Sequence, residues 1–416
     1  MTTMKTYKYR LFPTKKQVGT LQWTLDRNRE LYNAALQERK EIYKSTGKGT
    51  NYDAQSAQLP DIKTLREEYQ NIYSQVLQDT LKRVDKAFKA FFRRVKSGEK
   101  AGYPRYVGYD RYDSFTYPQA GFSLEGNRLV LSKIGHVKMK QHRPIQGKMK
   151  TCTLKREGSC WYVCLSCEVE TQQEQHTPYT DQAVGIDLGL SHFAALSTGD
   201  CLDNPRYYRK AEKKIATIQK EVSRKKRGSK RRKKAVKRLS KAYRKVRNQR
   251  SDFLHQWSRR LVNTYEAIVF EDLAPEKMSK APKSKQDEHG KYLPNGAAVK
   301  AGLNKSILDA GWSTFVSLCE YKAACAGVTQ VMKVDPYKTS QVCSGCLHEG
   351  PHKDLSERVH TCEQCGLVLD RDVNAAIVIQ SVWQDDLKLR PASKPKKTKK
   401  TQVRNEPTED SPLGSH

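Results

Sequence analysis

The chain has 416 residues, which is enough for two or three domains of about 150 residues and for a sizeable hydrophobic core. It carries 77 Lys and Arg against 45 Asp and Glu, and the formal net charge of +32 at pH 7 favours nucleic acid as a partner. It contains no uninterrupted apolar run of about 18 residues and begins without a secretory signal, so we expect a cytoplasmic protein with no membrane contact.

The N-terminal part of the chain combines a helical stretch with two β patterns. Residues 5–12 alternate polar and apolar side chains, which predicts a strand that ends at Pro13. Residues 15–97 repeat apolar side chains at three- and four-residue steps, which predicts helices. Residues 103–178 form short alternating runs separated by Gly and Pro, typical of a small β barrel or sandwich. We interpret the helices as an insertion into one β domain that includes the first strand.

The C-terminal part begins with a strand, a glycine turn and a second strand at residues 183–200. Residues 209–250 then hold 21 Lys or Arg and only two acids, so we expect this segment to be exposed and to contact phosphate. Residues 276–300 are polar and predict a loop, and the tail from about 388 has the composition of a disordered segment. The remaining periodic segments predict helices at 251–265, 306–328 and 372–383 and strands at 267–273 and 328–335.

Four cysteines have the spacing of a zinc site. Cys343, Cys346, Cys362 and Cys365 follow the pattern C-x2-C-x15-C-x2-C, in which each pair places two thiolates on one side of a tight turn. Because the protein supplies all four ligands, we expect a closed structural site with no position for chemistry. Cys164 and Cys167 are also separated by two residues, but in an extended strand they point to opposite faces and cannot easily share one metal.

Three carboxylates have unusual surroundings. Asp187 lies within the apolar run AVGIDLGL, Glu271 ends the run IVFE, and Asp372 opens the final helix. Taken singly, they could form a hairpin turn, a strand end at the surface and a helix cap. Taken together, the order strand–Asp–turn–strand, strand–Glu and Asp–helix is the layout of an RNase H-like nuclease, in which such carboxylates hold two Mg²⁺ ions.

Several motifs of the chain, taken together, resemble the TnpB family, the RNA-guided nucleases of bacterial insertion sequences, which are related to type V CRISPR effectors. The resemblance covers most of the chain. It rests on YKYRLFPTKKQ with ELYNAAL, LQDTLKRVDKAFKAFFRRVKSGEKAGYPRY, GIDLGLSHFAALSTG, IVFEDL, LDAGWSTFVSLCEYKA, and PYKTSQVCSGC with CEQCG and LDRDVNAA. Matched motif by motif, it implies catalytic, Mg²⁺-binding roles for Asp187, Glu271 and Asp372, all of which are present.

The resemblance also implies an α/β multidomain fold. In this family a wedge-like β barrel is interrupted by a helical recognition lobe and followed by an RNase H-like RuvC nuclease domain with a zinc-ribbon insert. The expected boundaries in this chain are 1–14 and 103–178 for the wedge-like barrel, 15–102 for the recognition lobe, 179–336 and 367–387 for the RuvC domain, 337–366 for the zinc ribbon, and 388–416 for a disordered basic tail.

The function implied by the resemblance is cutting of double-stranded DNA at sites chosen by pairing with a guide RNA. The guide RNA would come from the transposon end, one protein would bind one RNA, and the protein would read a short motif beside the target. Such an enzyme would work in the bacterial cytoplasm, on the nucleoid when bound to DNA. Because base pairing supplies the sequence information, the protein needs mainly to hold the nucleic-acid backbone, which suits a basic surface.

Two groups of residues are candidates for nucleic-acid contacts. Five residues match polar and aromatic positions around the recognition lobe and the SFTY turn of the family and are candidates for reading the target-adjacent motif, although each could equally be a packing or solvent-facing residue: Tyr52, Gln75, Gln78, Thr116 and Tyr117. Cations of the basic segment are candidates for phosphate contacts: Lys225, Arg227, Arg231, Arg232, Arg244 and Arg247.

Three other functions are compatible with these features. A compact type V CRISPR effector would share the motifs and the chemistry. A DNA transposase or junction resolvase would use the same fold without RNA. A regulator would bind guide and target without cutting, although the three intact carboxylates disfavour this alternative.

Overall fold

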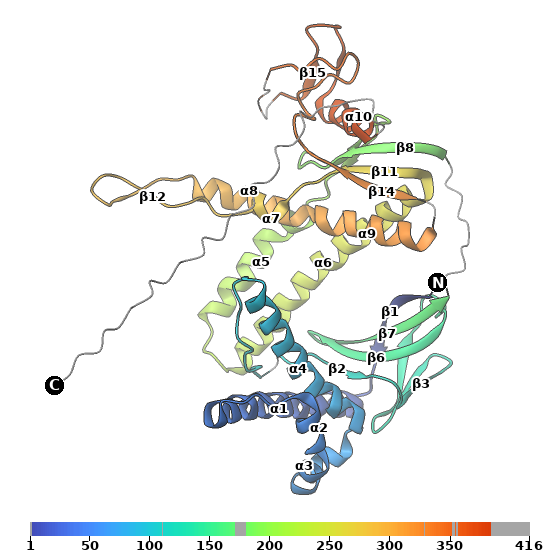
Figure 1. Ribbon diagram of the computed structural model, residues 1–416, viewed down its shortest axis with the longest axis vertical. Helices are drawn as coiled ribbons and strands as arrows, with labels where there is room; N and C mark the ends of the chain where they lie inside the picture. Colours follow the sequence, from blue (N-terminus) through green and yellow to red (C-terminus); the bar gives the residue numbers. More distant parts are fainter. Residues whose placement is uncertain are drawn as a thin grey trace, which may run out of the picture. The chain divides into compact units, whose positions relative to one another are not determined.

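The computed structural model describes residues 2–109, 111–170, 180–327, 329–351, 354 and 357–383 (Figure 1). The predicted disordered tail at 388–416 lies outside these residues. The chain divides into two compact units, Met1–Glu174 with Lys210–Gln249 and Gln175–Arg209 with Arg250–His416. None of the described helices is both long and apolar enough to cross a membrane.

The first unit is built on an antiparallel seven-stranded sheet in the order β2-β6-β7-β1-β5-β4-β3. Its strands are Thr2–Phe12 (β1), Ser114–Tyr117 (β2), Phe122–Glu125 (β3), Arg128–Leu131 (β4), Gly135–Lys140 (β5), Lys148–Glu157 (β6) and Cys160–Glu170 (β7). The first strand β1 pairs with β5 and with almost the whole length of β7. The prediction that this strand joins the later β segment is therefore confirmed.

Alternation along the strands decides which side chains enter the core of this sheet. In β1, Tyr7, Tyr9 and Leu11 are buried because they share one face of the strand. In β7, Cys167 is buried and Cys164 is only half-buried, as expected for residues three apart in a strand. The interpretation of these two cysteines as strand residues that do not share a metal agrees with this placement.

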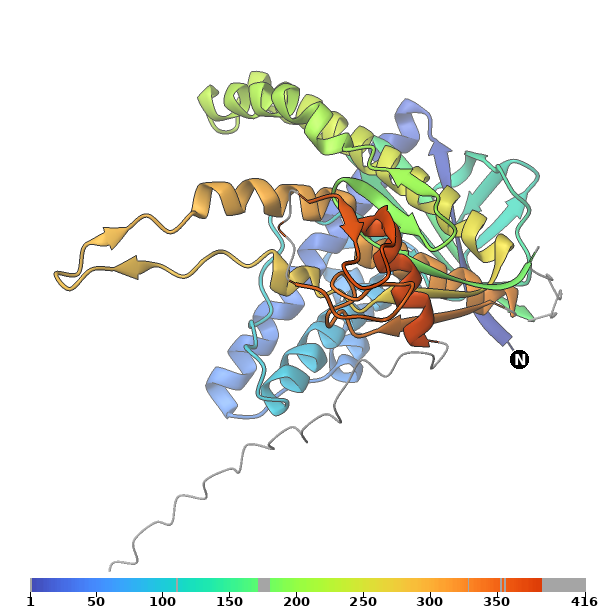
Figure 2. The same ribbon diagram turned by 90° about the horizontal axis from the view of Figure 1, so that it is seen from above.

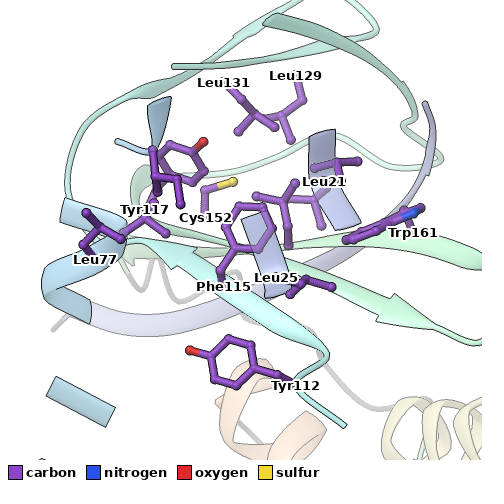
Figure 3. Packing of buried hydrophobic residues seen from close by; sticks show 14 of the residues in the cluster. Leu21, Leu25, Leu77, Tyr112, Phe115, Tyr117, Leu129, Leu131, Cys152 and Trp161 are labelled. Carbon is purple, nitrogen blue, oxygen red and sulfur yellow. The ribbon is translucent and has the colours of Figure 1, made fainter. Parts of the chain in front are cut away.

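The inserted helices cover this sheet. They are Lys15–Thr46 (α1), Tyr52–Ala57 (α2), Leu59–Leu65 (α3), the 3₁₀ helix Glu67–Asn71 (η1) and Ser74–Lys96 (α4). The helix α1 begins with a capping box, because Thr14 and Gln17 each accept a hydrogen bond from the other's backbone amide, and it ends at Gly47 with φ 68°. Leu21, Leu25 and Leu77 of α1 and α4 pack against side chains of β2, β4, β6 and β7 (Figure 3).

The basic segment forms two helices, Tyr207–Arg224 (α5) and Lys230–Thr264 (α6). The separate helix predicted at 251–265 is the C-terminal part of α6, so that prediction of a helix boundary is wrong. Gln219 donates a hydrogen bond of 2.8 Å to the Tyr243 hydroxyl, which ties α5 to α6. Residues 210–249 of these helices group with the first unit.

The second unit is built on a five-stranded sheet in the order β10-β9-β8-β11-β14. Its strands are Thr180–Asp187 (β8), His192–Leu196 (β9), Cys201–Asp203 (β10), Tyr265–Glu271 (β11) and Gln330–Val334 (β14). The strand β11 runs parallel to β8 and β14, whereas β9 is antiparallel to β8 and β10. The carboxyl ends of β8, β11 and β14 therefore lie at one edge of the sheet.

Helices cover both faces of this sheet. Val184 and Ile186 of β8 pack with Leu254, Leu261 and other side chains of one hydrophobic cluster. The intervening Gly185 faces the helix Arg371–Trp383 (α10), and a Cβ at this glycine would lie 2.0 Å from the Ala376 carbonyl oxygen. Glycine is required at this position because the backbones of β8 and α10 approach so closely.

The segment between β11 and β14 differs from the predicted loop and single helix. It contains Pro275–Met278 (α7), a hairpin of Lys285–Gln286 (β12) and Tyr292–Leu293 (β13), Ala297–Ala310 (α8) and Trp312–Ala326 (α9). Figure 2 shows the hairpin extending from α7 and α8. Gly311, with φ 74°, separates α8 from α9, because a left-handed residue cannot continue a right-handed helix.

Candidate functional site

Two of the predicted carboxylates lie at the ends of neighbouring parallel strands. In the ladder between β8 and β11, Ile186 pairs with Phe270. Asp187 and Glu271 each follow their member of this pair, so both lie at the same edge of the sheet. The sheet therefore brings together two acids that are 84 residues apart in the chain.

The third carboxylate, Asp372, lies in the first turn of α10, the helix that packs on β8. It does not cap this helix. Asp370, the last residue of a short strand, accepts hydrogen bonds from the backbone amides of Asp372 at 2.9 Å and Val373 at 3.1 Å. Asp370 is thus the helix-start residue, and the side chain of Asp372 remains available for another role.

The electrostatics of the site show that Asp187 interacts with both of the other acids. Loss of water contact, together with the charges of Glu271 and Asp372, raises the pKa of Asp187 to about 8. Burial also raises the pKa of Glu271, and a hydrogen bond from the Thr339 hydroxyl opposes that rise. Arg358 supplies a cation to the same site, with its Nη1 3.7 Å from Asp372 Oδ1.

The turn after β8 is held close to these acids. A Cβ at Gly189 would lie 3.9 Å from Asp372 Oδ2, so the turn and the carboxylate are neighbours. On the other side of the turn, the Leu190 carbonyl oxygen accepts hydrogen bonds from Asn204 at 3.2 Å and Arg206 at 3.3 Å. These two side chains fix the backbone that follows Asp187.

The carboxylates are spaced more widely than the cysteines. Within the described ranges, the one group of three or more His, Cys, Asp or Glu side chains with ligand atoms all within 4.8 Å of one another is formed by Cys343, Cys346, Cys362 and Cys365. The three acids offer only oxygen ligands, and mutual repulsion contributes to the raised pKa of Asp187. Such a donor set fits a hard cation, which would relieve that repulsion.

The four cysteines form a compact group that can hold one metal ion. The Sγ atoms of Cys343 and Cys365 are 3.7 Å apart, and those of Cys346 and Cys362 are 3.5 Å apart. Two tight turns bring the thiols together, because the amides of Leu347 and Gly366 donate to the carbonyl oxygens of Cys343 and Cys362. Four thiols at this spacing are the donor set of a tetrahedral metal site.

The cysteine group is tied to the helix that carries Asp372. The buried Asn374 of α10 donates a 2.8 Å hydrogen bond to the Val342 carbonyl oxygen and accepts one of 2.9 Å from the Ser344 amide. In addition, the Arg371 amide donates to the Arg358 carbonyl oxygen at 2.8 Å. The first cysteine turn and the start of α10 are therefore one connected structure.

The candidates for reading the target-adjacent motif have different surroundings. Tyr117 is a core residue: its side chain is 1% exposed, stacks on Tyr73 and donates a hydrogen bond to the Ser132 carbonyl oxygen. The prediction that Tyr117 contacts DNA is corrected for this reason. Thr116 is half-buried between Arg83 at 2.8 Å and Thr153 at 2.9 Å.

The other three candidates are half-buried in the helical insertion. Tyr52 opens α2 and packs against the core of the first unit, with the Lys82 ammonium 5.8 Å from its ring centre. Gln75 and Gln78 lie in α4, and Gln75 accepts a 3.4 Å hydrogen bond from the Ala120 amide.

Three of the predicted phosphate-binding cations already contact acids or carbonyl groups of the chain. Arg244 donates to the Glu157 carbonyl oxygen at 2.9 Å, and Arg247 pairs with the Glu157 carboxylate at 2.5 Å. Lys225 pairs with Glu221 at 2.5 Å. Arg227 and Arg231 are exposed and Arg232 is half-buried, at the turn between α5 and α6 and the start of α6.

Sequence reasoning missed the residues that support the site. Thr339, Arg358 and Asn374 are residue types that do not by themselves indicate a role. Thr339 lies inside PYKTSQVCSGC and Asn374 inside DRDVNAA, two residues after Asp372, so their positions in those motifs were the available signal.

Three family models match parts of the chain. Residues 165–281 match a family model described as “Probable transposase”, residues 312–379 one described as “Cas12f1-like, TNB domain”, and residues 1–48 one described as “Helix-turn-helix domain”. In this chain residues 1–48 form β1 and the single long helix α1. The chain is therefore similar to probable transposases over residues 165–281 and to the Cas12f1-like TNB domain over residues 312–379.

Two relatives match the chain over nearly its full length. The chain is 30% identical to the “Putative RNA-guided DNA endonuclease InsQ” of Escherichia coli K12, over 90% of this chain and 91% of the relative. It is 31% identical to the “Putative RNA-guided DNA endonuclease” of Streptomyces pristinaespiralis, over 97% of this chain and 96% of the relative. The chain belongs to the TnpB family.

Solved structures of CRISPR effectors are also similar. The “Cryo-EM structure of the Cas12f1-sgRNA-target DNA complex” contains a chain 18% identical, with a TM-score of 0.33, covering 91% of this chain and 99% of that chain. The “mini-RNA-guided endonuclease CRISPR-Cas_phi3” is 10% identical, with a TM-score of 0.44, covering 91% of this chain and 92% of that chain.

Proposed function

We propose that the chain is a transposon-encoded, RNA-guided endonuclease that cuts double-stranded DNA at a Mg²⁺-dependent site formed by Asp187, Glu271 and Asp372. The observation that carries this proposal is the placement of Asp187 near Glu271 and Asp372, because burial and the charges of these two acids raise the pKa of Asp187 to about 8. Membership of a family whose relatives are described as RNA-guided DNA endonucleases supports the assignment of the substrate and the guide.

The residues of this chain have distinct roles in the proposed reaction. Asp187, Glu271 and Asp372 would hold the ions, Thr339 orients the Glu271 carboxylate, and Arg358 adds a cation for a phosphate oxygen. Magnesium, when bound, supplies charge stabilisation for an in-line displacement at the phosphodiester. Asp370 sets the first turn of α10 and so directs Asp372 toward the sheet edge.

We also propose a domain layout and a structural zinc ion. Residues 1–14 and 103–178 would be the wedge-like barrel, 15–102 the recognition lobe, 179–336 and 367–387 the RNase H-like RuvC domain, and 337–366 the zinc ribbon held by the four cysteines. The antiparallel sheet with its inserted helices supports the first two assignments. The mixed sheet with acids at its edge and the close thiol group support the other two.

The proposal includes one guide RNA per protein, derived from the transposon end, and a target-adjacent motif read by the protein. Tyr52, Gln75, Gln78 and Thr116 remain the candidates for reading the motif. Arg227, Arg231 and Arg232 remain candidates for phosphate contacts, and Lys225, Arg244 and Arg247 could contribute by exchanging their present partners.

Sequencing the RNA that co-purifies with the chain, and cutting DNA that matches this RNA in Mg²⁺, tests the proposal directly. We expect Asp187→Ala, Glu271→Ala and Asp372→Ala each to abolish cutting while the RNA stays bound. Unchanged cutting by all three variants would overturn the catalytic assignment. Strand joining by the RNA-free protein would instead favour a transposase, which the “Probable transposase” match makes the second candidate.

A further inference from the structure

A segment between α4 and β2 has a feature that the proposed function does not use. Residues 101–108 form neither helix nor strand, and we call residues 101–109 the tyrosine strap. Its three tyrosines occur at every third position and are strongly exposed: Tyr103 is 45% exposed, Tyr106 46% and Tyr109 64%. Tyr112, the next in this series, is buried and lies beside Tyr32. Three aromatic rings in the same series thus remain accessible to a ligand.

The tyrosine strap is fixed along one face of α1. Asn33 donates a 3.0 Å hydrogen bond to the Val107 carbonyl oxygen and accepts one of 2.8 Å from the Val107 amide, as a neighbouring strand would. The Tyr106 hydroxyl donates to the side chain of Gln37. Because these partners on α1 are four residues apart, they lie on the same face of the helix.

Cations lie beside the exposed rings. The Lys40 ammonium is 4.2 Å from the Tyr106 ring centre and 5.4 Å from that of Tyr103. The Arg29 guanidinium is 5.9 Å from the Tyr109 ring centre. Both cations come from the face of α1 that holds the strap, so rings and positive charges alternate along it.

Anchoring of the strap does not account for the exposure of its rings. Asn33 and the buried Tyr112 hold the backbone, and Tyr103 is further fixed by edge-on contacts with Phe88 and Phe91. Burial of apolar area stabilises a protein only for the part of a ring that is covered. The uncovered half of Tyr106 and the larger uncovered part of Tyr109 therefore contribute little to folding.

The charge of the strap is complementary to a polyanion. Arg105 within the strap and Lys100 and Arg111 beside it are exposed, whereas Lys40 and Arg29 of α1 are half-buried beside the tyrosine rings. Aromatic rings interleaved with cations are the arrangement by which proteins hold single strands, because rings stack on bases and cations pair with phosphates. A duplex offers phosphates but hides the faces of its bases.

We propose that the tyrosine strap binds a single-stranded segment of nucleic acid, with Tyr106 and Tyr109 stacking on bases and Lys40 and Arg105 contacting phosphates. This inference rests on the proposed function only in that the chain handles nucleic acid. An extended chain spans roughly 20 Å from the first to the last of the three tyrosines, which corresponds to about six stacked nucleotides. Both RNA and DNA offer the required chemistry.

The test measures binding of fluorescein-labelled twelve-nucleotide RNA, DNA of the same sequence, and the RNA–DNA duplex to the full chain freed of co-purifying RNA. The variants are Tyr106→Leu with Tyr109→Leu, which removes the rings but keeps apolar bulk, and Tyr106→Phe with Tyr109→Phe, which keeps the rings. Leu65→Ala, in the exposed helix α3 of the same unit, is the surface control. Raised salt weakens the contribution of charge, so it exposes the contribution of stacking.

We expect the leucine variant to bind the single strands at least about tenfold more weakly than the phenylalanine variant. The ratio of the dissociation constants for RNA and DNA identifies which single strand the strap prefers. Equal affinity of the leucine and phenylalanine variants for single strands would overturn the proposal, and so would a loss of affinity confined to the duplex. As a second measurement, Lys40→Gln with Arg105→Gln should reduce the slope of log Kd on log salt by about 1.4 for single strands.

Cleavage of matched DNA is measured separately from single-strand binding, so the proposed nuclease function and the proposed role of the strap can fail independently. A chain that binds single strands through the strap but never cuts matched DNA would refute the proposed function and leave the strap in place. A leucine variant that binds and cuts like the unsubstituted chain would refute the strap and leave the nuclease in place. Thermal unfolding of each variant confirms that it is folded.

Discussion

At the scale of single residues, the candidate site depends on which hydrogen-bond donors each carboxylate is paired with. Asp370 accepts the first amides of α10, so Asp372 is not used as a helix cap. The Thr339 hydroxyl donates to Glu271, so one oxygen of that carboxylate is held in place by the protein. Neither assignment can be derived from residue type alone, because Asp370 and Asp372 are equally suited to cap a helix.

Replacing Thr339 with valine tests the positioning of Glu271. The loss of a hydrogen bond to a charged group costs about 1.5–3 kcal/mol, so we expect cutting to slow about tenfold or more and to require more Mg²⁺. Cleavage rates over a series of Mg²⁺ concentrations measure the effect. Thr339→Ser restores the hydroxyl and should recover most of the rate, and a serine variant as slow as the valine variant would contradict the role of the hydrogen bond.

At the scale of secondary-structure elements, α10 links the two halves of the candidate site. One end of the helix carries Asp372, and Asn374 in the same turn is bonded to the backbone of the first cysteine turn. Further along, α10 lies so close to β8 that only glycine fits at position 185. The position of the carboxylate therefore depends on contacts with the cysteine group and with the sheet.

Replacing Asn374 with alanine should separate the helix from the cysteine turn without removing a metal ligand. Two backbone groups lose their partner, so we expect the free energy of unfolding to fall by about 2 kcal/mol and cutting to slow, while the proposed zinc ion is retained. Denaturant unfolding and metal analysis measure these outcomes. Cys362→Ser with Cys365→Ser should also remove the proposed zinc ion, and full cleavage by that zinc-free protein would show that the cysteine group does not position Asp372.

Replacing Gly185 with alanine should force α10 away from β8. The added methyl would meet the Ala376 carbonyl oxygen at 2.0 Å, so we expect a loss of about 3 kcal/mol or more of stability, or failure to fold. Gly19→Ala is the matched control, because a Cβ there meets nothing within 4 Å. In helix α1 that change should be neutral or stabilising by up to about 1 kcal/mol. Similar unfolding curves for the two variants would contradict the close approach.

At the scale of the whole molecule, the net charge of +32 decides the class of partner, but the contacts decide which cations are free to bind it. In the first unit Glu157 engages Arg244, Arg247 and Lys8. The two arginine contacts attach α6 to the end of β6, and the Lys8 pair joins β1 to the same glutamate. Arg227 and Arg231 are exposed instead, so the basic segment contains both structural and available cations.

The salt dependence of RNA binding should separate these two kinds of cation. Arg227→Gln with Arg231→Gln removes two phosphate contacts, so the slope of log K on log salt should become shallower by about 1.4 for single-stranded RNA. Arg244→Gln with Arg247→Gln should change this slope less and should lower the stability of the first unit. Titrations at several salt concentrations and thermal unfolding measure both effects, and equal slopes for the two double variants would refute the distinction.

Local patterns predicted much of this protein, because side-chain periodicity, paired cysteines and an acid inside an apolar run act over a few neighbouring residues. They identified β1, the helices of 15–97, the four cysteines and the three acids now proposed as catalytic. They missed the hairpin of β12 and β13 and the break at Gly311. The family resemblance suggested Tyr117 as a DNA contact, but its side chain lies in the core.

Tertiary structure decided how the candidate site is assembled, because that assembly depends on contacts between residues distant in the chain. Only the ladder between β8 and β11 places Asp187 beside Glu271, and only the packing of α10 on Gly185 brings Asp372 to them. The same holds for Asn374, Thr339 and the tyrosine strap, whose roles are set by a carbonyl, a carboxylate and a helix face that no local pattern specifies.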